Sequence, residues 1–199
     1  WTGNTSNDWF VVTNWSAGIP SSGTPTNIDV PAGNPAPVIS GGAASSGLLA
    51  VGQNAAGSLT IQNGGRLDTG PTLGSDIANG AGSTGTVTVT GTGSVWSNAG
   101  FLSVGTRGTA TLIISNGGTV TSSDAGGFIG YTDNAQGTVL VTGPGSAWNI
   151  FPTDPNGGLR VGGTLQAGVI PPGIGTGTLT VADGGIVSVI GGTGTIFVA

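Results

Sequence analysis

Short runs of alternating apolar and polar residues recur along the chain and predict β-strands. The clearest run is residues 86–90, in which Val87 and Val89 alternate with threonines. Such alternation places valine on one face of a strand and threonine on the other. Both residue types suit a pleated, half-buried surface. The pattern predicts an all-β chain with few or no helices.

The predicted strands belong to a long internal repeat. One unit reads L-x-V-G, then S/T-L-x-I, then N-G-G; it occupies residues 48–70 and 102–123 and begins again at residue 159. A second unit, G-T-V-x-V-T-G-x-G-S-x-W, alternates with it at residues 85–96, and at residues 137–148 with Leu140, Pro144 and Ala147 at varied positions. Trp96 and Trp148 place the two units together at about 52 residues. An insertion through Ile170, Pro171 and Pro172 lengthens the last copy.

The central strands recur about every 25 to 28 residues, a step that fits one turn of a solenoid. Each turn has room for three short strands, and corners such as residues 63–65 supply asparagine and glycine, which tolerate positive φ. One turn cannot bury its own apolar face, but stacked turns can. We therefore predict a parallel β-helix (β-solenoid) of about five to six turns. An antiparallel β-sandwich is disfavoured, because it would not need the two units in fixed alternation.

The first 31 residues differ from the rest and predict an aromatic cap. Trp1, Trp9, Phe10 and Trp15 lie close together in the sequence, and the terminal units of solenoids are atypical. A platform for sugar stacking or subunit contact is the alternative. We assign residues 1–31 to this capping or contact segment and residues 28–199 to a single solenoid domain, with an irregular first turn.

Composition narrows the classes of partner. The chain has no Cys, Met, His, Lys or Glu, and its net charge is −5. Nucleic-acid binding is disfavoured, because it needs cations to displace phosphate counterions. Without cysteine or histidine, neither disulfides nor a thiolate metal site is expected. We see no membrane-inserting run, and the start at Trp1 suggests a mature or trimmed secreted form.

Catalytic chemistry is weakly supported. Polysaccharide-active β-helix enzymes need clustered carboxylates, whereas the aspartates here are scattered, with only Asp68/Asp76 and Asp124/Asp133 close enough to share a loop. We expect aspartates to cap turns, arginines to lie on the surface, no cofactor, and at most an incidental Ca²⁺ near residues 124–133. Threonine pairs such as Thr86 and Thr88 raise ice binding as a minor alternative. The acidic and basic residues are Asp8, Asp29, Asp68, Asp76, Asp124, Asp133, Asp154, Asp183, Arg66, Arg107 and Arg160.

The alternating units resemble the repeats of bacterial autotransporter passengers and PEP-CTERM surface proteins. The opening W-T-G, D-W and N-W-S motifs of residues 1–16 are similar to the segment that precedes such repeats. The resemblance implies a right-handed β-helix outside a Gram-negative-type cell, in an adhesin or a biofilm matrix component.

These observations predict a non-enzymatic, secreted or surface-exposed structural protein. Its last strand, residues 194–199, is apolar and begins a turn that the chain does not complete. Such an edge favours strand addition and head-to-tail filaments, so the main predicted partner is a second copy. An adhesin that binds glycans or host cells is the alternative function, and a polysaccharide-active enzyme a minor one. The candidate assembly contacts are Trp1, Trp9, Phe10, Trp15, Ile196, Phe197 and Val198.

Overall fold

The structure is a computed structural model that describes residues 1–70, 74–163, 175–191 and 194–198. All of its regular elements are β-strands except one 3-10 turn, η1 (Val12–Asn14). The strands form three sheets in which every pairing between named strands is parallel. This confirms the β-solenoid and excludes the antiparallel sandwich. The insertion at residues 170–172 lies outside the described residues.

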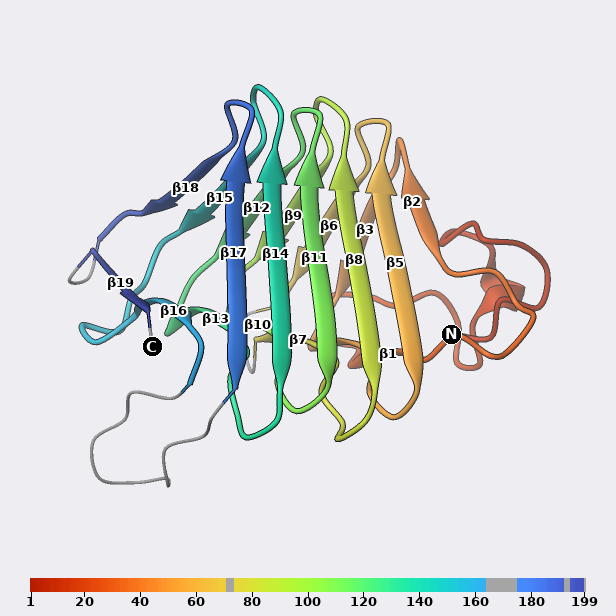
Figure 1. Cartoon of the computed structure of the whole chain (residues 1–199). Coiled ribbons are helices and arrows are strands. Elements are labelled where there is room, and N and C mark those ends of the chain that lie inside the picture. The colour runs from red at the N-terminus through yellow and green to blue at the C-terminus, as the bar shows by residue number, and fades with distance from the viewer. Residues whose placement is uncertain (71–73, 164–174, 192–193, 199) are drawn as a thin grey trace.

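The chain visits the three sheets in a fixed order (Figure 1). Sheet 1 contains β2 (Val38–Ser40), β5 (Ala56–Gln62), β8 (Thr84–Thr90), β11 (Thr109–Ser115), β14 (Gln136–Thr142) and β17 (Thr176–Ala182). Sheet 2 contains β3 (Ala43–Ser46), β6 (Arg66–Thr69), β9 (Val95–Asn98), β12 (Thr119–Ser122), β15 (Ala147–Ile150) and β18 (Ile186–Val189). Sheet 3 contains β1 (Thr26–Ile28), β4 (Leu49–Val51), β7 (Ser75–Ile77), β10 (Leu102–Val104), β13 (Gly126–Ile129), β16 (Gly158–Val161) and β19 (Thr195–Val198).

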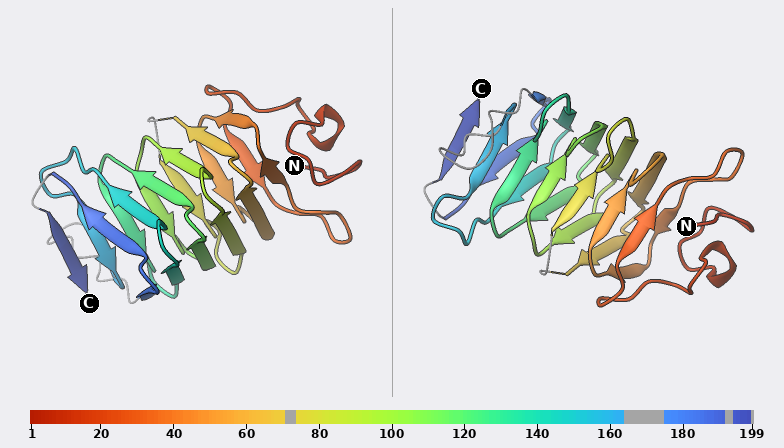
Figure 2. Two further views of the ribbon diagram at one scale, coloured as in Figure 1. Left: turned by 90° about the horizontal axis from the view of Figure 1, so that it is seen from above. Right: turned by 90° about the horizontal axis from the view of Figure 1, so that it is seen from below.

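These strands make six coils, each with one strand from every sheet, preceded by β1. In Figure 1 the strands of sheet 1 rise at the front while the chain advances from right to left and returns behind, which is a right-handed coil. The views from above and below show the coils stacked into a short rod (Figure 2). At about 4.8 Å per coil, the six layers of sheet 1 extend over roughly 25 Å.

The interior is filled by rows of apolar side chains from successive coils. Leu59, Val87, Leu112 and Val139 are in register in sheet 1 and have no exposed surface. The L-x-V residues of sheet 3, Leu102, Val104, Leu159 and Val161, are also buried, as the repeat predicted. Because each row spans several coils, no coil is stable without its neighbours.

The two-coil repeat has a physical origin at the corners between sheets 1 and 2. The N-G-G corners place Asn63 and Asn116 at positive φ, 53° and 52°. The intervening corners instead supply a buried serine. Ser94 Oγ accepts a hydrogen bond from the Gly64 N–H (3.1 Å), and Ser146 Oγ accepts one from the Gly117 N–H (3.0 Å). Each N-G-G corner is therefore held by the serine of the next coil.

Tryptophan packing follows the same two-coil period. Trp96 and Trp148 are inward residues of sheet 2, fully buried, and two strands apart with Val120 between them. Each indole N–H donates to a hydroxyl of an earlier coil, Thr69 for Trp96 (3.2 Å) and Ser122 for Trp148 (3.1 Å). The buried N–H groups are thus paired, as buried polar groups usually are.

The N-terminal segment lies against the first coil. Trp9 is fully buried, and its ring meets that of Trp15 edge to face, with centroids 4.6 Å apart. Asp8 forms a parallel bridge with Val38, so this part of the segment pairs with the outer edge of β2. The regular strands begin at Thr26, two residues earlier than the predicted start of the solenoid.

Candidate functional site

The outer face of sheet 1 carries mostly hydroxyl side chains. Its outward positions in β5, β8, β11, β14 and β17 carry no charged residue. In one row of outward residues, running from strand to strand, two apolar side chains, Ile113 and Leu140, stand between threonines. A second row is unbroken and consists of Ser58, Thr86, Thr111, Thr138 and Thr178.

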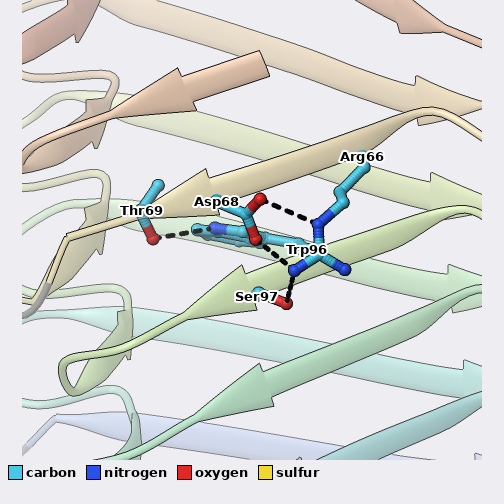
Figure 3. Close-up of polar contacts among 5 residues, drawn as sticks. All are labelled: Arg66, Asp68, Thr69, Trp96 and Ser97. Carbon is cyan, nitrogen blue, oxygen red and sulfur yellow. Dashed lines mark hydrogen bonds and ion pairs between the residues drawn. The ribbon is translucent and has the colours of Figure 1, made fainter. Parts of the chain in front are cut away.

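The outer face of sheet 2 carries an ion pair. Arg66 and Asp68 approach to 2.5 Å, and the same guanidinium nitrogen, Nη2, donates to Ser97 on the next strand (3.2 Å; Figure 3). Hydrogen bonding to Asp68 raises the pKa of Arg66. Both side chains are well exposed, so the pair contributes little to stability. The figure also shows the buried indole of Trp96 with its bond to Thr69.

The outer face of sheet 3 combines aromatic and charged groups. The Arg160 guanidinium lies 5.5 Å from the Phe128 ring centroid and 5.6 Å from that of Phe197, one strand away on each side. One Arg160 nitrogen donates to the Asn156 carbonyl (3.1 Å). These contacts favour a structural role for Arg160, because cation–π contacts between adjacent strands stabilise the stacking of successive coils.

Asp76, two coils below Phe128 on the same sheet, is buried although it points outward. Burial raises the pKa of its carboxyl, against the opposing effects of a hydrogen bond from Thr106 (2.6 Å) and the charge of Arg107. A perturbed carboxyl of this kind can mark a functional site. Here it stands apart from the other acids.

The carboxylates are dispersed, and several support the backbone. Asp29 accepts hydrogen bonds from three successive N–H groups, those of residues 53, 54 and 55. Asp68 and Asp76, which the sequence could have placed on one loop, lie on different sheets with different partners. Asp124 and Asp133 flank opposite ends of β13. The described residues contain no group of three potential metal ligands, and incidental Ca²⁺ binding remains a prediction.

A groove of about 230 Å³ lies within the N-terminal segment, between residues 1–25 and β1. Trp1 is one of its lining residues, and the Trp1 ring is fixed by two contacts. Its Nε1–H donates to the Pro35 carbonyl (2.9 Å), and the ring meets Trp15 edge to face at 4.8 Å. The main-chain nitrogen of Trp1 also donates to the Asn27 carbonyl (3.0 Å). The lining residues, none with a charged side chain, are Trp1, Trp15, Ser16, Ala17, Gly18, Pro20, Thr24, Pro25, Thr26 and Asn27.

The structure separates the candidate assembly contacts into two groups at opposite ends of the rod. At the N-terminal end Trp9 is fully buried and Trp15 nearly so, and Phe10 packs against Gly42. Only Trp1 and Phe10 therefore have much surface to offer a partner. At the other end Ile196 is 48% exposed and Val198 75% exposed, while Phe197 stacks on Arg160. Whether any of them contacts a second copy remains a prediction.

Part of the chain is similar to an autotransporter adhesin. A stretch of 75 residues, 37% of the chain, is 41% identical to the adhesin BmaC autotransporter of Brucella suis biovar 1 (strain 1330). The chain spans about 2% of the length of that curated relative. No family model matches the chain, and no solved structure matches it. This similarity agrees, coarsely, with the autotransporter-like repeats seen in the sequence.

The described residues include no helix with the length and apolar character needed to cross a membrane.

Proposed function

We propose that this protein is an adhesin-like module of a secreted or cell-surface protein and that it is not an enzyme. The observation that carries the proposal is the 41% identity over 75 residues to an autotransporter adhesin. The right-handed β-helix is consistent with it, because stacked coils present long, regular faces to a partner.

The non-enzymatic part of the proposal is supported by how the carboxylates are used. Acid–base or metal-assisted cleavage of polysaccharides needs carboxylates that converge on one place. Asp29 is engaged with backbone N–H groups, Asp68 with Arg66, and Asp76 with Thr106. These three carboxylates form hydrogen bonds within the fold and do not lie together as a catalytic pair.

An adhesion assay tests the proposal. Beads coated with the folded chain should bind to epithelial cells or immobilised cell-surface glycans above the level of beads coated with an unrelated β-helix. The Trp148→Ala variant, expected to lose its fold, is the control for dependence on native structure. Binding no stronger than that of the unrelated protein would refute the adhesin-like function. Release of reducing sugars from acidic polysaccharides would refute the non-enzymatic part.

Self-assembly is a second candidate, favoured by the exposed last coil. Ile196 and Val198 continue the inward rows of Leu159 and Val161, yet both are substantially exposed. A further coil could cover them, whether it comes from the same polypeptide or from a second copy. At the other end, residues 7–9 already occupy part of the β2 edge. A second copy would therefore meet the aromatic segment there rather than a fully open strand.

Electron microscopy and sedimentation test self-assembly. The native chain should form filaments at high concentration, and Val198→Asp should abolish them by placing a charge in the contact. Thr180→Asp, an exposed outward change on the same coil, is the matched control and should leave filaments intact. Only monomers at high concentration would refute the filament.

A further inference from the structure

We infer that the groove between residues 1–25 and β1 binds one neutral sugar unit of a glycan. This inference rests on the proposed adhesin function and names a site and a ligand class for it. Its first support is shape and size. The groove, at about 230 Å³, is smaller than the roughly 300–1,000 Å³ of sites for drug-sized molecules. It therefore fits a small ligand such as a single sugar ring with its substituents.

The second support is the aromatic wall. Sugars present C–H groups that pack on aromatic rings, and indole combines a large apolar face with low conformational freedom. The Trp1 ring is held by its bond to Pro35 and by the edge contact with Trp15. Its position is thus fixed before a ligand arrives, which lowers the entropic cost of binding.

Gly3 is part of the support for this ring. It adopts a φ of +63°, and a methyl group there would lie 2.8 Å from both the Pro35 oxygen and Trp1 Nε1. Only glycine allows the chain to pass so close to the anchored indole. The backbone of the segment is therefore shaped around the position of Trp1.

The third support is a set of polar groups that the fold does not use. Among the described residues, neither the Ser16 hydroxyl nor the Asn27 side-chain amide has a hydrogen-bond partner. Both line the groove and are exposed. A hydroxyl and a carboxamide can each donate and accept, as sugar hydroxyls require. Other groups in the lining, such as Thr26, bond within the chain.

The charge of the lining bears on the class of sugar. No lining side chain is charged, and the Trp1 ammonium already donates to the Asn27 carbonyl while burial lowers its pKa. An acidic sugar gains most from a bidentate arginine, and none of the three arginines lines the groove. A neutral sugar loses nothing from that absence, because neutral donors and acceptors satisfy its hydroxyls. The lining chemistry therefore favours neutral over acidic glycans.

The test is a titration of the native chain with glucose, galactose, mannose and N-acetylglucosamine, and with glucuronate and sialic acid. Calorimetry gives the dissociation constant, expected near 1 mM for one sugar unit (about −4 kcal/mol). The chain has five tryptophans, so the part of the fluorescence change that Trp1→Ala abolishes is the part that reports on Trp1. At least one neutral sugar should bind saturably and more tightly than either acid. Trp1→Ala and Asn27→Ala should each weaken binding about tenfold or more. Asn54→Ala, an exposed asparagine outside the groove, should leave it unchanged.

Several outcomes overturn the inference. It fails if no neutral sugar binds saturably, if the acids bind more tightly, or if Trp1→Ala and Asn27→Ala bind like the native chain. Circular dichroism and thermal unfolding of each variant separate lost binding from lost fold. If coated beads still adhere to cells while no sugar binds, the groove is not the site and the adhesin-like function stands. If neither adhesion nor sugar binding occurs, both proposals fail.

Discussion

Trp148 packs against Gly127 so closely that a methyl group on Gly127 would lie 2.7 Å from Cζ2 of the indole. Cη2 of the same ring and Cδ1 of Leu159 would also be within 3.1 Å. We expect Gly127→Ala to lower the free energy of unfolding by about 1–3 kcal/mol, as overpacking of a buried site does. Chemical denaturation measures the change.

Gly23→Ala is the matched control, because a methyl group at Gly23 meets no atom within 4 Å. Its effect should be within about 0.5 kcal/mol. In the double variant Gly127→Ala/Trp148→Leu, the smaller leucine leaves room for the new methyl group. The two changes should therefore cost less together than the sum of their separate effects. Strict additivity would contradict the proposed contact.

Asp29 holds the corner of the next coil through three backbone N–H groups, at 2.7 to 3.3 Å. Asp29→Ala should lower the free energy of unfolding by about 1–2 kcal/mol, the range expected for charge-assisted bonds at a half-buried position. Asp154→Ala removes a single bond at an exposed turn and should cost no more than about 0.5 kcal/mol. Equal costs would show that the Asp29 contacts do not order this corner.

The Asn98 side chain joins four groups at the buried corner between sheets 2 and 3. Its Oδ1 accepts hydrogen bonds from Thr69 (2.7 Å) and Ser75 (2.8 Å), and its Nδ2 donates to the carbonyls of residues 100 and 101. Asn98→Ala removes all four of these bonds at a buried corner and should cost about 2–4 kcal/mol. The two carbonyls keep one bond each, from the Ser123 and Ser75 N–H groups. Asn149→Ala, on an outward position of the same sheet, loses one bond to Ser188 and should cost less than about 1 kcal/mol. Thermal unfolding of both variants makes the comparison.

Asp76 should make stability depend on pH. Because burial raises its pKa above the ordinary value of 3.8, the folded chain holds the proton more tightly than the unfolded chain. The contribution of Asp76 to stability is therefore greatest below pH 3.8 and falls as the pH rises through the raised pKa. Asp76→Asn cannot ionise, so its stability relative to the native chain should increase over this window.

Denaturant unfolding at several values from about pH 3 to pH 7 measures this difference for Asp76→Asn. Subtracting the native curve removes the titration of the other aspartates, which both proteins share. Asp183→Asn, the same change at an exposed corner, is the control for the substitution itself. If the stability of Asp76→Asn relative to that of the native chain fell as the pH rises, the predicted sign would be wrong.

The sequence predicted the coils because their determinants are local and repeated. Val87 and Val89 alternate with threonine, and Asn63 with its glycines marks a corner, so strand and turn can be assigned from neighbouring residues. The inward direction of Leu102 and Val104 follows from the same alternation, and both are buried. Contacts between coils could not be assigned in this way. Nothing next to Asp29 indicates that its partners begin 24 residues later.

Only some of the residues that line the groove could be identified from the sequence. Trp1 and Trp15 were notable as aromatic residues in an atypical segment, and both line it. Ser16 was noted only as part of the N-W-S motif and Asn27 not at all, because their place in one lining depends on the path of the loop between them. Pro20 and Pro25, which stiffen that loop, were the available signal. The stack of Arg160 between Phe128 and Phe197 was missed for a similar reason, since those residues meet only through the register of sheet 3.

The alternation of Trp96, Val120 and Trp148 along sheet 2 has a consequence for how such rods can vary in length. Deleting a single coil would bring two tryptophan layers, or two N-G-G corners, into direct succession, whereas deleting two preserves every interface. The length of the rod should therefore change by two coils at a time. Related proteins that gain or lose coils should do so in steps of about 52 residues, the spacing of the two tryptophans. Each step changes the length of the rod by roughly 9.5 Å.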